Sequence, residues 1–195
     1  MPTHLNHTER NTFFFITFTC YRWLNLFKET NIYNYLPFWF EKLKEKGCML
    51  NGYVIMPNHF HLVLYVSSEV KNLSLVIAES KRFLAYEIVK RLKQQKKQGL
   101  LEVLQSGVST KEKEKGKKHQ VFRLSFDAKP IDLSEVGRVL DYIHRNPVSK
   151  KWQLVQEYVD YPHSSAAFYE GGQEPEFGLV DFRGLLPESS ESSNE

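Results

Sequence analysis

Hydrophobic positions in the first third of the chain predict a strand followed by a helix. Residues 13–21 are aromatic and β-branched, with Phe and Thr alternating in the second half, which indicates a buried strand. Apolar side chains then recur at helical spacing from Ile32 to Leu43 and stop at Gly47, which predicts a helix. Because Pro37 lies within this stripe, we expect the helix to begin late or to bend there.

The middle of the chain predicts two adjacent strands and a long helix. Strands are expected over residues 49–56 and 60–66, joined by a tight turn at Pro57-Asn58. Residues 73–97 carry apolar side chains at helical spacing on one side and basic side chains over much of the remainder. This pattern is typical of a helix with one buried face and one solvated face.

The next segment predicts a loop, a short strand and a capped helix. Residues 106–118 are rich in Ser, Gly, Lys and Glu without a hydrophobic period, so we expect a flexible loop. Residues 121–126 alternate as a short strand does. The sequence Asp-Leu-Ser-Glu at 132–135 resembles a capping box that opens a helix. Asn146-Pro147 should end that helix, because a residue before proline avoids the α region.

The resulting order of elements, β-α-β-β-α-β followed by a third helix, predicts an α+β fold. It is the order of a ferredoxin-like split βαβ sheet with helices on one face. We expect one domain over residues 11–150, a C-terminal extension over 151–186 that packs on it, and a disordered Ser/Glu-rich tail over 187–195. A fold of this kind supports many functions, so the function has to come from particular residues.

Charge is distributed unevenly although the net charge is only +3. Residues 81–123 contain thirteen Lys or Arg against four acids, whereas residues 153–195 contain one Arg against nine acids. A basic middle and an acidic end suggest a polyanion that meets one face of the protein. The alternative is a solvated helix followed by a solvated tail.

Other features of the composition limit the class of protein. No apolar stretch approaches the roughly 18 to 20 residues that span a bilayer, and residues 1–11 lack the pattern of a signal peptide. Two cysteines, Cys20 and Cys48, are too few for a disulfide scaffold or a four-cysteine zinc site. We therefore expect a soluble cytoplasmic protein without a membrane partner.

His59 and His61 are the first candidate for chemistry. They lie two residues apart at the start of an expected strand, so their imidazoles point to the same face while Phe60 points to the core. Two neutral imidazoles side by side can clamp a metal ion. The alternative is a pair of surface histidines on a half-exposed strand.

A second candidate is the polar stripe on the helix after residue 132. Arg138, Tyr142 and Asn146 are successive i, i+4 neighbours on its surface, whereas His144 lies off the stripe. A tyrosine between an arginine and an asparagine could act as a nucleophile beside a phosphate and a metal ligand. The alternative is an amphipathic surface helix whose tyrosine packs at a boundary.

Together, these segments resemble the single-tyrosine HUH transposases, within them the branch related to the REP-associated tyrosine transposases. The carrying motifs are Met-Pro-Asn-His-Phe-His-Leu-Val at 56–63 and Asp-Tyr-Ile-His-Arg-Asn-Pro-Val at 141–148. Further matches are Phe-Ile-Thr-Phe at 15–18 followed by Arg22, and Tyr-Pro-His-Ser-Ser-Ala at 161–166 with Phe168 and Tyr169. The resemblance extends over about residues 11–170. The length and charge of residues 98–119 and the acidic C-terminal segment depart from a compact family member.

The resemblance implies an enzyme that cuts and rejoins single-stranded DNA, at or beside an imperfect hairpin, through a 5′-phosphotyrosine intermediate. Carried over by motif, His59 and His61 become metal ligands, Tyr142 the nucleophile and Asn146 the third ligand. The implied ion is Mg²⁺ or Mn²⁺, whereas the ligand chemistry of two imidazoles alone suggests zinc. The family also implies a central strand for the histidines and either a monomer or a homodimer.

For the DNA partner we expect phosphate contacts from the basic side chains of two helices, namely Lys81, Arg82, Lys90, Arg91, Arg138 and Arg145. Two other functions compete with the transposase. One is a non-catalytic single-strand nucleic-acid binder on the same fold, with aromatic side chains for stacking. The other is a zinc hydrolase built on His59 and His61, although no Glu base and no further ligands lie near the pair in sequence.

Overall fold

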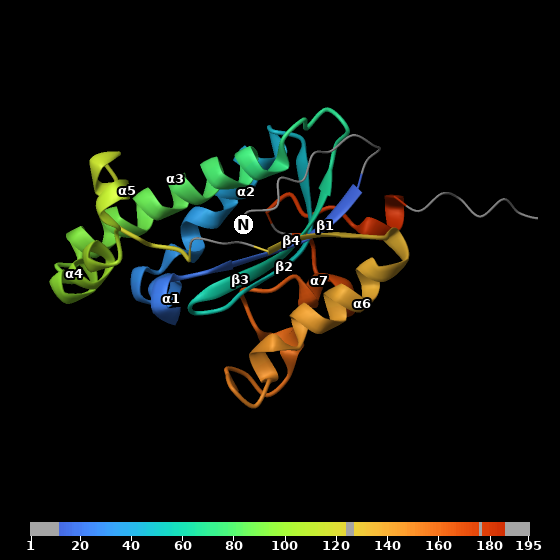
Figure 1. Cartoon of the computed structure of the whole chain (residues 1–195). Coiled ribbons are helices and arrows are strands. Elements are labelled where there is room, and N and C mark those ends of the chain that lie inside the picture. The colour runs from blue at the N-terminus through green and yellow to red at the C-terminus, as the bar shows by residue number, and fades with distance from the viewer. Residues whose placement is uncertain (1–11, 124–126, 176, 186–195) are drawn as a thin grey trace, which may run out of the picture.

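The computed structural model describes residues 12–123, 127–175 and 177–185. The tail expected at 187–195 lies outside this part of the chain, as do the last residues of the strand expected at 121–126. A central sheet carries helices on both of its faces (Figure 1). Within the described ranges, no helix is long and apolar enough to cross a membrane.

The sheet has four antiparallel strands in the order β2-β3-β1-β4. Their bounds are Thr12–Thr19 for β1, Cys48–Ile55 for β2, His59–Val66 for β3 and Asp127–Ile131 for β4. Because β3 lies between β1 and β2, the first βαβ unit is split by an inserted strand. The predicted α+β, ferredoxin-like fold is confirmed.

The fourth strand differs in position from the prediction. It was expected at 121–126, but β4 lies at Asp127–Ile131, and Phe122 makes only an isolated bridge with Cys20. β4 contains Pro130 and pairs with β1 at the edge of the sheet, where a missing N–H donor is tolerated. Because proline is unusual in strands, the sequence pattern did not indicate a strand at these residues.

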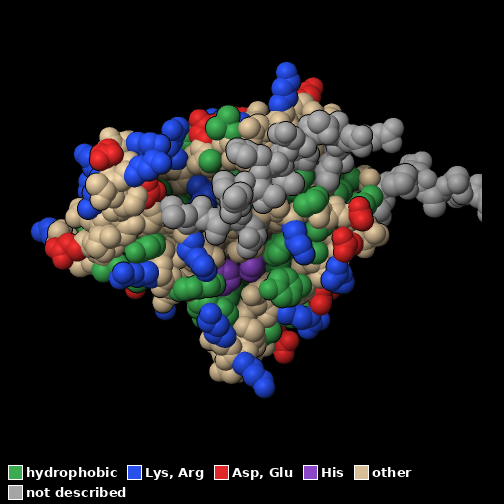
Figure 2. Space-filling model, in the orientation of Figure 1, with side chains coloured by type: hydrophobic (Ala, Val, Ile, Leu, Met, Phe, Trp, Pro, Cys, Tyr) green, Lys and Arg blue, Asp and Glu red, His purple; other side chains and the backbone are tan. Residues whose placement is uncertain are grey.

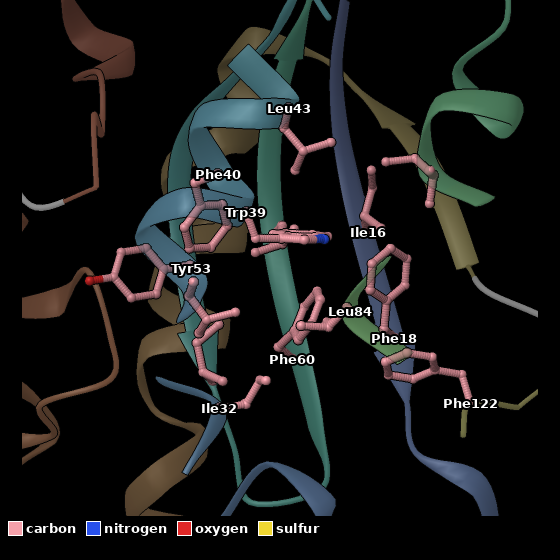
Figure 3. Packing of buried hydrophobic residues seen from close by; sticks show 14 of the residues in the cluster. Ile16, Phe18, Ile32, Trp39, Phe40, Leu43, Tyr53, Phe60, Leu84 and Phe122 are labelled. Atoms are coloured by element: carbon pink, nitrogen blue, oxygen red, sulfur yellow. The ribbon is translucent and has the colours of Figure 1, made fainter. Parts of the chain in front are cut away.

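Three helices cover one face of the sheet: α1, Leu26–Thr30; α2, Leu36–Lys44; and α3, Leu73–Gln94. A 3-10 helix at Ile32–Tyr35 precedes α2, and Pro37 lies in the first turn of α2, so the helix begins late as predicted. Aromatic rings fill the space between this layer and the sheet, as Figure 3 shows. The Phe18 and Phe60 ring centroids are 4.7 Å apart, and Trp39 meets both rings edge-on.

Helix α6, Leu133–His144, packs on the opposite face, so the expectation of helices on one face only is wrong for this helix. The predicted capping box of Asp132 and Glu135 is present at its start. Its apolar side contacts a second cluster of buried residues on the sheet, among them Val54 and Val63. A Cβ on Gly52 of β2 would lie 2.1 Å from Leu140 Cδ2, so the glycine allows the helix to approach the strand closely.

The segment after α3 is folded, which corrects the prediction of a flexible loop over residues 106–118. It contains α4, Gln98–Ser106, and α5, Thr110–Glu114, at the far end of α3 (Figure 1). Ser109 and Glu112 form a capping box that opens α5. The α4 side chains of Leu101 and Leu104 are buried in the main core. The short α5 buries no residue, which is why no hydrophobic period marks it in the sequence.

The C-terminal segment runs along β2. Ile55 N–H donates to the His163 carbonyl at 2.8 Å, and Val180 N–H donates to the Leu50 carbonyl at 2.8 Å. The segment includes α7, Ala166–Gly171, and short 3-10 helices at Asn146–Val148, Tyr158–Asp160 and Phe182–Leu185. It therefore supplies backbone partners to the outer strand of the sheet.

Candidate active site

His59 and His61 lie at the start of β3 on the face that α6 covers. The register pairs them with Thr19 and Thr17 of β1, and the intervening Phe60 is buried in the opposite core. Their ring centroids are 5.0 Å apart, and their exposed fractions are only 6% and 7%. The sheet thus brings the two predicted imidazoles together, as the alternation along a strand requires.

Hydrogen bonds orient both rings through Nδ1. His59 Nδ1 is 2.7 Å from Asn58 Oδ1, while Asn58 Nδ2 donates to the Trp23 carbonyl at 2.9 Å. His61 Nδ1 is 2.8 Å from the hydroxyl of Thr17. Because the Asn58 amide oxygen only accepts, His59 carries its proton on Nδ1 and keeps a lone pair on Nε2. The Thr17 hydroxyl can accept from His61 in the same way.

Both imidazoles are neutral at physiological pH. Burial lowers the pKa of His59 to about 4, with a smaller contribution from the charge of Lys151. Burial likewise lowers the pKa of His61 to about 3, with a smaller contribution from His59. A neutral imidazole with a free nitrogen lone pair is the form that ligates a metal ion.

Tyr142 of α6 faces the histidine pair. Its ring centroid lies 6.1 Å from that of His61 and 6.3 Å from that of Phe15, and 59% of the residue is exposed. Phe15 stacks on His61 at 5.3 Å, so the three rings form one group. Two segments some 80 residues apart in the sequence therefore meet at this site.

Two other tyrosines near the C-terminus are unsuited to nucleophilic attack. The Tyr161 hydroxyl donates to the Ile55 carbonyl at 2.8 Å, and the Tyr169 hydroxyl donates to the Asn51 carbonyl. Burial raises the pKa of both phenols, so each holds its proton more tightly than a free tyrosine does. Of the three, Tyr142 is the exposed one.

Asn146 lies one turn after Tyr142, just beyond α6, where the 3-10 helix Asn146–Val148 begins. Its side-chain Nδ2 donates to the Tyr142 carbonyl at 3.1 Å and to the Ile143 carbonyl at 3.2 Å. The amide nitrogen thus caps the helix, which leaves the amide oxygen as the atom that a metal ion could use. Within the described ranges, no cluster of three or more His, Cys, Asp or Glu side chains could hold a metal.

Two arginines, Arg138 on α6 and Arg145 just after it, flank Tyr142 on the surface. Arg138 pairs with Glu135 at 2.6 Å, and its side chain is 77% exposed. Arg145 pairs with Asp141 at 2.7 Å, and its guanidinium carbon lies 4.9 Å from the centre of the Tyr158 ring. Both arginines are held by neighbours yet stay open to solvent.

On α3, three of the four expected phosphate contacts share a groove. Lys81, Arg82 and Lys90 line a groove of about 1160 Å³ between α3 and residues 115–123. Lys81 is half-buried, with Nζ 5.0 Å from the centre of the Phe18 ring, and burial lowers its pKa to about 8. These three side chains are placed together, as a polyanion contact requires.

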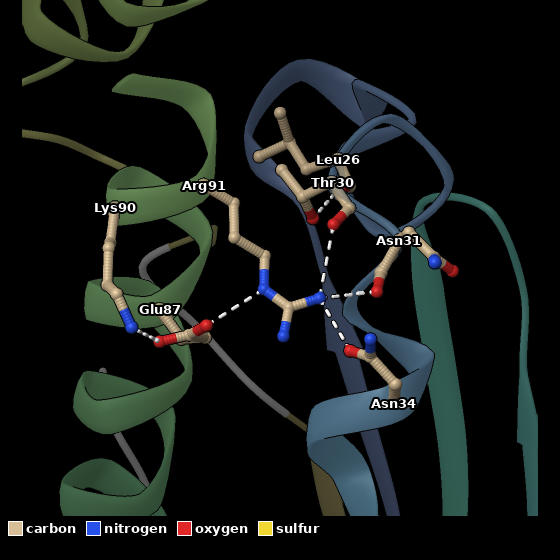
Figure 4. A network of polar contacts seen from close by, with 7 residues as sticks. All are labelled: Leu26, Thr30, Asn31, Asn34, Glu87, Lys90 and Arg91. Carbon is tan, nitrogen blue, oxygen red and sulfur yellow. Dashed lines mark hydrogen bonds and ion pairs between the residues drawn. The ribbon is translucent and has the colours of Figure 1, made fainter. Parts of the chain in front are cut away.

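Arg91 has a different environment. Its guanidinium donates to Glu87, to the carbonyls of Thr30 and Asn31, and to Asn34 Oδ1 (Figure 4). This set of bonds ties α3 to the segment between α1 and α2. Arg91 does not line the groove, so the structure separates it from the other three side chains of α3 that were expected to contact phosphates.

Sequence reasoning missed two tryptophans beside the histidines. The Trp23 ring centroid lies 6.0 Å from that of His59, and the Trp152 centroid lies 5.8 Å from it. Figure 2 shows histidine side chains between hydrophobic ones on this face, with Lys and Arg side chains around them. Trp23 has no periodic neighbours, so only its position next to Arg22 could have marked it.

Comparisons with known proteins support the fold. The chain matches no family model and no curated protein. It is similar to a solved structure described as a REP-associated tyrosine transposase bound to a REP hairpin, at 17% sequence identity. That match has a TM-score of 0.55 and covers 92% of each chain. At this identity, the likeness establishes a shared fold.

Proposed function

We propose that the protein cleaves and rejoins single-stranded DNA with Tyr142 as nucleophile. The observation that carries the proposal is the exposed Tyr142 ring, 6.1 Å from the ring of a buried, neutral His61. The likeness in fold to a transposase, itself bound to a hairpin, supports the same chemistry. We expect single-stranded DNA with a hairpin as the partner.

The donor set fits a divalent transition ion. His59 and His61 would hold it through Nε2, with the Asn146 amide oxygen as a further donor. Imidazole nitrogens suit ions such as Mn²⁺ better than Mg²⁺, which prefers oxygen ligands. When bound, such an ion polarises the scissile phosphate and stabilises the charge that develops on it.

In the proposed step, Tyr142 Oη attacks the phosphorus and the bond to the 3′ oxygen breaks. The phenolic proton passes to solvent, and the departing 3′ oxygen takes a proton from solvent. A 5′-phosphotyrosine and a free 3′-hydroxyl result. Because the linkage is a phosphodiester, a 3′-hydroxyl can attack it in turn and restore the strand without an added energy source.

Tyr142→Phe tests the proposal. We expect the variant to fold and to bind Mn²⁺ and DNA as the wild type does, while the covalent adduct disappears, since only the attacking oxygen is lost. The measurement is the retention of labelled single-stranded genomic fragments on the protein in denaturing gels. Tyr35→Phe is the control, because Tyr35 lies outside both the histidine site and the groove beside α3. An adduct that persists in Tyr142→Phe would contradict the assignment.

A single-strand binder without catalysis is the second candidate. The basic groove beside α3 favours it, because such a groove tracks a nucleic-acid backbone independently of any reaction. It predicts salt-dependent binding by a wild type that forms no adduct in Mn²⁺ or Mg²⁺.

A further inference from the structure

Trp23 is held in an unusual backbone conformation next to the histidine pair. Arg22 and Trp23 have φ angles of 50° and 59°, in the left-handed region that side chains other than glycine rarely adopt. The Asn58 side chain, next to His59, donates to the Trp23 carbonyl at 2.9 Å. Strained residues of this kind cluster at functional sites. Trp23 is 47% exposed, so in this conformation the residue lies at the surface beside the histidines.

Two cations lie against the Trp23 ring. Lys151 Nζ is 4.8 Å from the ring centre, and the Arg123 guanidinium carbon is 5.7 Å from it. Lys151 also lies 5.6 Å from the centre of the Trp152 ring. Neither cation forms an ion pair with an acidic side chain among the described residues. An aromatic surface with adjacent cations is the arrangement that binds a base and its phosphates.

Arg123 connects this ring to the groove beside α3. It lines the groove and contacts Trp23, which in turn lies against His59. The groove is lined by cations from both walls and, among the residues described, by no acidic side chain; the cations are Lys81, Arg82, Lys90, Lys93, Lys115, Lys117, Lys118 and Arg123. Its volume of about 1160 Å³ exceeds that of most small-molecule sites, and its apolar part includes Val89 and Phe122.

We propose that the single strand next to the cleavage site runs along this groove and stacks a base on Trp23. Lys151 and Arg123 hold the phosphates on either side of that base, and the next phosphate reaches the histidine pair. The position of the cleaved phosphate rests on the proposed function, whereas the path itself is a binding site. Because every base has a π face, the stack accepts any sequence.

Binding in EDTA tests the path without cleavage. The probe is a labelled deoxythymidine oligonucleotide, and its affinity for the full chain is measured by fluorescence anisotropy. We expect Trp23→Ala to weaken binding about tenfold, since stacking on one ring contributes roughly that factor, and Trp23→Phe to retain most of it. Phe38→Ala is the matched control, because Phe38 is an exposed aromatic residue on α2, outside the groove.

Salt dependence tests the groove. Lys93 and Lys118 are exposed, come from opposite walls and have no ion-pair partner among the described residues. Replacing both by Gln should reduce the slope of log affinity against log salt by about 1.4, from about 0.7 per lost phosphate contact. Lys44→Gln with Lys71→Gln removes the same charge outside the groove and should leave the slope unchanged.

The outcomes separate the path from the catalytic proposal. The proposed path is overturned if Trp23→Ala binds with wild-type affinity, or if Lys93→Gln with Lys118→Gln leaves the salt slope unchanged. This holds even if Tyr142 forms an adduct. A loss of affinity in Trp23→Ala and a reduced salt slope in the double lysine variant support the path. If the wild type then forms no adduct with any metal ion, the catalytic proposal is overturned while the path stands. If Trp23→Ala does not fold, Lys151→Gln tests the same site, because Lys151 is exposed and lies against the Trp23 ring. This variant should also bind the oligonucleotide more weakly, and wild-type affinity would overturn the path.

Discussion

At the scale of single residues, the site depends on partners that fix the histidines. The Thr17 hydroxyl is 2.8 Å from His61 Nδ1, on the strand next to β3. Such a partner sets which ring nitrogen carries the proton and how the ring is aimed. The Phe/Thr alternation of residues 13–21 predicted a strand, but not that one threonine would reach a histidine 44 residues away.

Thr17→Val should weaken metal binding by the histidine pair. Valine has the shape of threonine without the hydroxyl, so His61 Nδ1 loses its partner. Losses of this kind reduce metal affinity by about 10- to 100-fold, which calorimetry with Mn²⁺ would measure. Thr19→Val is the control, because Thr19 faces His59 in the register without a side-chain hydrogen bond among the described residues. Equal Mn²⁺ affinity in both variants would show that Thr17 does not orient the ligand.

Lys81 carries its charge at a cost to stability. Burial lowers its pKa from 10.5 to about 8, so the folded state releases the proton before the unfolded state as pH rises. The penalty is full below pH 8 and fades toward pH 10.5. Lys81→Met should therefore raise the free energy of unfolding at pH 7 by roughly 1–3 kcal/mol, with a smaller gain at pH 9.5.

Urea denaturation at both pH values measures this gain, with the exposed Lys93→Met as the control. A gain that stays constant between pH 7 and 9.5 would show that the charge of Lys81 is not the cause. The same variant should bind the oligonucleotide more weakly, because it lacks one of the cations that line the groove.

At the scale of elements, the contact between α6 and β2 positions Tyr142. Gly52 leaves the space that Leu140 fills, and Leu140 lies two residues before the tyrosine. The capping box of this helix was predictable because it is local in the sequence. The closeness of the helix to the strand was not, because it depends on a glycine that lies 88 residues away from Leu140.

Gly52→Ala should destabilise the protein by about 1–3 kcal/mol, since the new methyl group overlaps Leu140 Cδ2 and α6 has to move. Thermal unfolding measures the loss. Gly99→Ala is the control, because a Cβ there meets nothing within 4 Å. In a double-mutant cycle, Gly52→Ala and Leu140→Ala together should cost less than the sum of their separate effects. Additive losses would mean that the two side chains do not compete for this space.

Arg91 links α3 to the segment after α1 through the bonds of Figure 4. Arg91→Met should lower the free energy of unfolding by about 1–3 kcal/mol, because two carbonyls and Asn34 lose their donor. Affinity for the oligonucleotide and its salt slope should stay the same. Lys90 is the neighbouring residue and lines the groove. Lys90→Met should therefore reduce the affinity and the salt slope while leaving the free energy of unfolding nearly unchanged. A reduced salt slope in Arg91→Met would show that Arg91 does contact a phosphate, as the sequence predicted.

At the scale of the whole molecule, hydrophobic period predicted the sheet and the helices that bury a face. It failed where elements bury little: α5 has no buried residue, and β4 is a five-residue edge strand with a proline. It also gave no information on which face α6 covers. The histidine pair followed from the period of a strand, whereas Trp23 emerged only from contacts between distant segments.

The division of the site between two elements has a consequence for a cut strand. The histidines are fixed in the backbone ladder of the sheet, while Tyr142 is carried by a helix that is held by side-chain packing. If Tyr142 is the nucleophile, as proposed, the 5′ end of a cut strand would be attached to α6 rather than to the strand that carries the histidines. On the proposed function, the cut ends would stay aligned for resealing only while α6 remains packed on the sheet, so weakening this interface would leave the strand broken.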